Sequence, residues 1–238
     1  MTGGLDIILV DTMRPKLAFI HSSHVLIPLF SQLAAEHLAD VEVFHMVDES
    51  LIRNTIAAGE LTPDTTRRLI GHIASAHEGG ADAVMVTCSS IGPAIPIARQ
   101  QLNFPVLRID EAMVDAAVRM GRRIGVVATL RTTLEPTMAL LRSGAAAASR
   151  DVELIPELCA GAFQAVLAGD TACHDEMLSA ALLKLAKTVD VIVLAQASMA
   201  RIVAQMNWQG NPPILSSPEL AVRSARNVLF PQRAAVPR

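Results

Sequence analysis

Two copies of one structural unit follow each other along this 238-residue chain, and this internal repeat constrains the fold more than any other feature. The segment DAVMVTCSSI at residues 82–91 aligns without gaps with DVIVLAQASM at residues 190–199. Two further pairs occur in the same order at nearly the same spacing: 17–22 with 124–129, and 40–44 with 151–155. Single hydrophobic strands resemble one another by chance, but three ordered matches indicate a duplicated βαβ-type unit.

Short runs rich in valine, isoleucine and leucine alternate with longer amphipathic stretches, a pattern typical of βα units around buried parallel sheets. We therefore expect an α/β fold of two similar lobes. Residues 1–110 together with 210–238 are assigned to the first lobe, and residues 111–209 to the second. The predicted strands are Lys16–His21, Val41–Val47, Ala83–Thr87, Val106–Ile109, Arg123–Thr129, Val152–Ile155, Val191–Ala195 and Ile214–Leu215.

Helix boundaries differ in how well the sequence defines them. Thr62, Pro63 and Asp64 supply a cap and a proline for the first turn of a helix that we expect to reach Glu78. The alanine-rich stretch 143–149 fits either a helix end or a mobile connector, and its periodicity does not choose between them.

Composition excludes several classes of partner. A net charge of −3 and an aromatic content of 3% argue against binding of nucleic acid, which needs basic surfaces and stacking side chains. No apolar run reaches the roughly 20 residues that span a bilayer, and the start of the chain lacks the features of a secretion signal. We therefore expect a cytoplasmic protein without a membrane partner.

The cysteines and histidines do not predict a metal centre. Cys88, Cys159 and Cys173 lie far apart, so that neither a disulfide framework nor a structural zinc site is indicated. His72 and His77 are five residues apart, which places them on different faces of a helix. We read all three cysteines as free thiols and expect no metal site.

Cys88 is the most specific chemical feature, because it ends a buried strand just where a helix is expected to start. Unpaired N–H groups and the helix dipole at that point would lower the thiol pKa and favour the thiolate, which acts as a base or nucleophile. Ser89 and Ser90 could hold a carboxylate or an enediolate with the backbone amides. The alternative is a buried structural cysteine followed by ordinary helix capping.

Several motifs together resemble the aspartate/glutamate/hydantoin racemase superfamily, which includes maleate isomerases and arylmalonate decarboxylases. The resemblance extends over residues 16–220. It rests on FIHS at 19–22, VDE at 47–49, GADAVMVTCSS at 80–90, PVLRID at 105–110, RIGVVAT at 123–129 with Thr132 and Thr133, and DVIVLAQASMA at 190–200.

The resemblance implies two Rossmann-like lobes related by a pseudo-twofold axis, with the active site in the cleft between them. It also implies a cofactor-independent enzyme, a small carboxylate substrate, and a homodimer or higher homo-oligomer. In this superfamily two cysteines act on opposite faces of a substrate carbon. Cys88 matches the first, but Gln196 stands in the place of the second, and an amide neither takes nor releases a proton near neutral pH.

The expected activity is therefore proton transfer at the carbon next to a carboxylate of a small amino, hydroxy or dicarboxylic acid, with Cys88 as the thiol acid/base. One alternative is a single-cysteine decarboxylase or cis–trans isomerase. Another is a non-catalytic sensor whose cleft binds a carboxylate. A nucleotide-binding role is disfavoured because no GxGxxG or Walker-type loop follows any predicted strand.

Other residues are assigned roles by the same resemblance or by their position. Gln196 is expected to make hydrogen bonds, and His21 either carries a proton or orients Asp48 or a backbone group. His174 could reach the cleft from the second lobe or cap a helix at the surface. The predicted substrate-binding residues are Ser22, Asp48, Ser89, Ser90, Thr129, Thr132, Thr133, Ser198 and His174.

Overall fold

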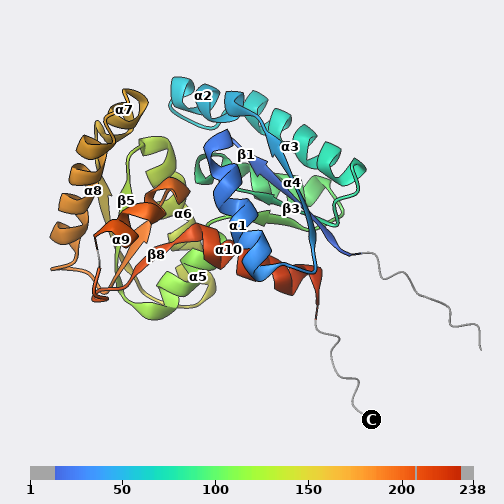
Figure 1. Ribbon diagram of the computed structural model, residues 1–238. Coiled ribbons are helices and arrows are strands. Elements are labelled where there is room, and N and C mark those ends of the chain that lie inside the picture. The colour runs from blue at the N-terminus through green and yellow to red at the C-terminus, as the bar shows by residue number, and fades with distance from the viewer. Residues whose placement is uncertain (1–13, 207, 232–238) are drawn as a thin grey trace, which may run out of the picture.

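The computed structural model describes residues 14–206 and 208–231, and it contains two four-stranded sheets in which every strand pair is parallel (Figure 1). The first sheet has the order β2-β1-β3-β4 and the second the order β6-β5-β7-β8, so the two lobes share one topology. The predicted α/β fold with two similar lobes is confirmed. The strands are β1 Lys16–His21, β2 Glu42–Val47, β3 Ala83–Val86, β4 Val106–Arg108, β5 Arg123–Ala128, β6 Glu153–Leu158, β7 Val191–Leu194 and β8 Ile214–Ser216.

Helices flank both sheets (Figure 1). The α-helices are α1 Ile27–His37, α2 Glu49–Ala58, α3 Pro63–Glu78, α4 Ile95–Gln101, α5 Glu111–Met120, α6 Arg131–Ala147, α7 Ala162–Leu167, α8 Thr171–Leu185, α9 Ala200–Gln205 and α10 Ser217–Leu229. Three short 3₁₀ turns follow the ends of central strands: η1 His24–Leu26, η2 Ser89–Ala94 and η3 Ala197–Met199. Helix α3 begins and ends where the sequence predicts, with Thr62 as its cap. The alanine-rich stretch continues α6 as far as Ala147.

The duplication extends to individual hydrogen bonds. In the first lobe Asp82 accepts a bond of 2.7 Å from the backbone N–H of Lys16, where β1 begins. In the second lobe Asp190 accepts a bond of 2.8 Å from the backbone N–H of Arg123, where β5 begins. Each aspartate therefore fixes the start of its central strand in the same way, as expected for two copies of one unit.

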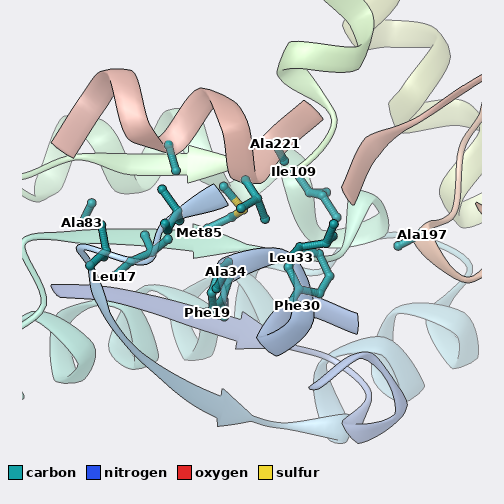
Figure 2. Close-up of a cluster of buried hydrophobic side chains, with 14 residues drawn as sticks. Leu17, Phe19, Phe30, Leu33, Ala34, Ala83, Met85, Ile109, Ala197 and Ala221 are labelled. Carbon is teal, nitrogen blue, oxygen red and sulfur yellow. The ribbon is translucent and has the colours of Figure 1, made fainter. Parts of the chain in front are cut away.

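Both faces of each sheet are buried, which explains the nearly continuous apolar runs of the strands. Leu17, Phe19 and Met85 face one core cluster of the first sheet, and alternate residues of the same strands face another. Figure 2 shows the first of these clusters, with Ala197 of η3 at its edge. A residue that follows a strand of the second sheet thus packs into the core of the first lobe.

Strand β8 and helix α10 lie within the segment 210–238 that the sequence assigns to the first lobe, and they contact both lobes; residues 1–13 and 232–238 of that assignment lie outside the described part of the chain. Strand β8 pairs with β7 and completes the second sheet. Helix α10 then lies between the lobes and packs against α1 on one side and α5 on the other (Figure 1). Its residues Ala221 and Ala225 join the core cluster of the first sheet, so this helix holds the lobes together.

None of the helices in the described part of the chain combines the length and apolarity needed to cross a membrane.

Candidate active site

The carboxyl ends of the strands in the two sheets meet at one place. Ser90, which follows β3, shares a buried hydrogen bond of 2.8 Å with Thr133, which follows β5. Turn η2 packs against α6 around this contact. Open parallel sheets bind ligands beyond the carboxyl ends of their strands, so this junction is the candidate active site.

Cys88 lies at this junction as the residue that caps η2, and its side chain is half-buried. Burial is the largest influence on the thiol and raises its pKa. Hydrogen bonds from the Ser22 side chain and from the backbone N–H groups of Ser90 and Ile91 act in the opposite direction without cancelling it. The thiol is therefore protonated near neutral pH.

This raised pKa corrects the sequence-based expectation that the helix start would favour the thiolate. The N–H groups do contact the sulfur as expected, but they belong to η2, a 3₁₀ turn of six residues. So short a turn has a small summed dipole, and desolvation of the thiolate outweighs it.

Gln196 occupies the equivalent position in the second lobe. Its side-chain oxygen accepts hydrogen bonds from the backbone N–H of Thr129 at 2.7 Å and from the Thr129 hydroxyl at 2.9 Å. Thr129 follows β5 as Ser22 follows β1, so the Thr129–Gln196 contact repeats the Ser22–Cys88 contact of the first lobe. Cys88 and Gln196 therefore have equivalent hydrogen-bond partners in their own lobes, as two copies of one unit would give.

The predicted substrate-binding hydroxyls differ in their exposure and in their hydrogen-bond partners. Ser89, Ser90, Thr129 and Thr133 are buried at the junction. The hydroxyl of Thr132 is also buried, and it has no hydrogen-bond partner in the part of the chain that the structure describes. Ser198 is exposed at the surface of η3. Hydrogen bonds connect Ser22, Cys88, Ser90 and Thr133, with the Ser90–Thr133 bond crossing between the lobes, and a separate contact joins Thr129 to Gln196.

His21 is buried, and both of its ring nitrogens have partners other than Cys88 and Asp48. Nδ1 lies 2.8 Å from the Thr87 hydroxyl, and Nε2 lies 2.9 Å from Nδ1 of His45. Because the Thr87 hydroxyl donates to the carbonyl of Ile20, it accepts from His21, which fixes the proton on Nδ1. These contacts engage both ring nitrogens of His21.

The neutral form of His21 makes stability depend on pH. Burial, followed by the neighbouring His45, lowers the pKa of His21 to about 4 from its usual 6.5. The unfolded chain takes up the proton first as pH falls, so stability is retained above pH 6.5 and lost toward pH 4. The free energy of unfolding should fall by about 2 kcal/mol between pH 7 and pH 5.

Urea denaturation at pH 7, 6 and 5 measures this dependence. Compared with the wild-type protein, His21→Phe should flatten this dependence. An unchanged slope in His21→Phe would show that other groups cause the loss.

Asp48 and His174 have partners within their own lobes. Asp48 caps α2 and accepts hydrogen bonds from Ser50, Arg68 and His72. Burial would raise the pKa of Asp48, but these donors together hold it well below its usual range. Both carboxylate oxygens are thereby occupied. His174 is buried beside Asp175, at 2.7 Å, and Asp175 in turn pairs with an arginine of α9.

Sequence reasoning missed one charged pair that supports the junction. Arg108, at the end of β4, forms two hydrogen bonds with the fully buried Asp110, at 2.6 and 3.0 Å. The guanidinium lies against Gly92 of η2, where the Cβ of any other residue would come within 2.4 Å of Nε. The sequence did contain a signal for this buried ion pair: an arginine ends an apolar strand, and an aspartate follows two residues later.

Among residues 14–206 and 208–231, no group of three or more His, Cys, Asp or Glu side chains is arranged to hold a metal ion.

Comparisons with known proteins agree with this architecture. The model of the Asp/Glu/Hydantoin racemase family matches residues 20–225. A glutamate racemase from Bacillus anthracis superposes with a TM-score of 0.70 at 16% identity, over 92% of this chain and 82% of that chain. A Francisella tularensis glutamate racemase solved with D-glutamate gives 0.72 at 12% identity, over 94% and 85%.

An allantoin racemase from Klebsiella pneumoniae gives a TM-score of 0.63 at 15% identity, over 94% of this chain and 96% of that chain. No curated protein is similar enough in sequence to count as a match. The structural likenesses are too distant in sequence to show more than the fold, whereas the family model spans most of the chain. From its fold and this match, the chain belongs to the Asp/Glu/Hydantoin racemase family.

Proposed function

We propose that this protein catalyses proton transfer at the carbon next to a carboxylate of a small organic acid, with Cys88 as its only thiol acid/base and without a cofactor. The observation that carries the proposal is the pair of equivalent positions at the junction. One holds a thiol bonded to Ser22, and the other holds the amide of Gln196 bonded to Thr129. Family membership supports a racemase-type enzyme, and the amide limits proton transfer to one lobe.

The hydroxyls of the junction are suited to binding a carboxylate. Ser90 and Thr133 come from different lobes and share a hydrogen bond, and the hydroxyl that accepts in this bond keeps its own proton free to donate to an anion beside the pair. Removal or arrival of a proton at the neighbouring carbon passes through an enediolate, whose extra charge develops on the carboxylate oxygens. Donors that are already in place stabilise that charge without reorganisation.

The protonated state of Cys88 determines the direction of its first step. When a hydrogen must first leave the carbon, the minor thiolate form of Cys88 removes it and returns a proton to the same face. When the enediolate forms instead by loss of carbon dioxide, the thiol donates its proton to it, and the resulting thiolate is stabilised by Ser22 and by the N–H groups of η2. Water then returns the proton. Gln196 can neither accept nor supply that proton, so the carbon should be protonated on one face only.

A decarboxylase is the second candidate, and the same protonated thiol favours it. When a malonate-type acid loses carbon dioxide, the electrons of the broken carbon–carbon bond remain as an enediolate, which needs one proton and no base. Cys88 supplies that proton. A cis–trans isomerase that begins with thiolate addition is less well supported, since the raised pKa keeps thiolate scarce.

The cellular setting is part of the proposal. We infer a cytoplasmic homodimer or higher homo-oligomer that acts on a small carboxylate and not on nucleic acid. This inference is supported by the family resemblance and by the weakly acidic composition.

Deuterium uptake from heavy water tests the proposed function. Wild-type protein incubated with a panel of 2-amino, 2-hydroxy and malonic acids should place one deuterium at the carbon next to the carboxylate of at least one acid, as measured by mass spectrometry. If acids bind and none acquires deuterium or loses carbon dioxide, the protein is a sensor and the proposal is wrong.

A further inference from the structure

The amide of Gln196 presents only a hydrogen-bond donor to the junction. A backbone N–H can only donate, so the 2.7 Å contact with Thr129 N requires the amide oxygen, not the nitrogen, at that position. The Thr129 hydroxyl donates to the same oxygen. The NH₂ group has no partner among the described residues, and it is therefore left to donate to a ligand.

The segments that form the junction contain no carboxylate. Four strand ends contribute to it, and none carries Asp or Glu among the residues that follow its strand: 21–25, 87–92, 129–134 and 195–199. The polar groups of these segments are hydroxyls, backbone N–H groups, one thiol, one amide, two histidines and Arg131. Such groups bind an anion well and a cation poorly.

The carboxylates that follow these and the neighbouring strands already have partners, and Glu135, the next residue after 129–134, pairs with Arg131. Arg68 and His72 contact Asp48, which follows β2. Arg108 neutralises the buried Asp110, which follows β4. An ammonium group bound at the junction would thus have no free carboxylate to pair with, and an unpaired buried charge is costly.

We propose that the ligand of this junction is a small dicarboxylic acid without an ammonium group, and that the Gln196 NH₂ donates a hydrogen bond to one of its two carboxylates. The proposal rests on the proposed function for the location of the site, and it narrows the substrate class. One carboxylate lies beside the hydrogen-bonded hydroxyls of Ser90 and Thr133. The other lies at the position equivalent to the thiol, where Gln196 acts as a specificity-determining residue.

Malate and aspartate distinguish the two substrate classes, because they share a carbon skeleton and differ only in a hydroxyl or an ammonium group. Isothermal titration of wild-type protein with both enantiomers of each should give a Kd for malate at least tenfold below that for aspartate. Gln196→Met removes the donor and should weaken malate binding roughly tenfold or more. Gln196→Glu places a carboxylate against the ligand and should abolish binding.

Gln101 is exposed at the end of α4, so Gln101→Glu is the matched control and should bind malate as wild type does. Equal or tighter binding of aspartate would overturn the proposal, as would Gln196→Met with unchanged malate affinity, or no binding of malate at all. The titration needs no turnover. If malate binds through Gln196 while no acid takes up deuterium, the proposed function fails and the ligand class stands.

Discussion

Replacing Cys88 with alanine is expected to lower kcat for proton transfer by about 10²- to 10⁴-fold, the usual contribution of a positioned acid or base. The large effect follows from the lack of a substitute: Gln196 cannot titrate, and both nitrogens of the buried His21 are engaged by Thr87 and His45. Ligand affinity should change little, because the hydroxyls and the Gln196 amide remain. Steady-state kinetics and titration calorimetry on the same preparation separate the two quantities.

Cys173 is exposed and provides the matched control, since Cys173→Ala should keep wild-type kcat. Cys88→Ser tests proton transfer itself: a hydroxyl preserves the size and hydrogen bonds of the side chain but is a much weaker acid, so activity should stay low. Substantial activity in both Cys88 variants would mean that another group moves the proton.

Replacing Arg108 with leucine is expected to reduce the free energy of unfolding by about 3–5 kcal/mol, the cost of leaving one partner of a buried ion pair uncompensated. Asp110 is fully buried, and Arg108 supplies the two hydrogen bonds that satisfy its carboxylate. The guanidinium also supports Gly92 in the turn that begins at Cys88. Activity should therefore fall along with stability, as measured by urea denaturation and kinetics.

A partly exposed ion pair nearby serves as a comparison for the buried Arg108–Asp110 pair. Arg99 makes a bidentate contact with Glu111 in a partly exposed setting, and Arg99→Leu should cost less than about 1 kcal/mol. The double variant Arg108→Leu with Asp110→Asn removes the stranded charge and should recover part of the loss. If Arg108→Leu costs no more than Arg99→Leu, the buried pair is not a determinant of stability.

The fold could be predicted well because its signals are local and repeated. Alternation of apolar runs with amphipathic stretches placed the strands, and the ordered matches predicted two lobes of one topology. Strand β6 extends to Leu158, three residues beyond the predicted end at Ile155, because Pro156 interrupts the apolar pattern. Proline is tolerated there since β6 is the edge strand of its sheet.

The candidate site was less predictable, because its properties depend on packing between distant segments. The sequence indicated Cys88 and Gln196 as equivalent positions, but burial of the thiol decided the direction of its pKa shift. The Ser90–Thr133 contact and the orientation of the Gln196 amide depend on how the lobes pack. The crossing of α10 between the lobes likewise has no local signal, since amphipathic helices look alike whichever lobe they cover.

The configuration of the deuterium-labelled product tests most directly whether Cys88 alone delivers the proton. Chiral separation after turnover in heavy water should give one labelled enantiomer from the wild-type protein. Gln196→Cys should give both enantiomers, because it restores a thiol on the opposite face of the substrate carbon. Racemic labelled product from the wild-type protein would contradict a single proton donor at this junction.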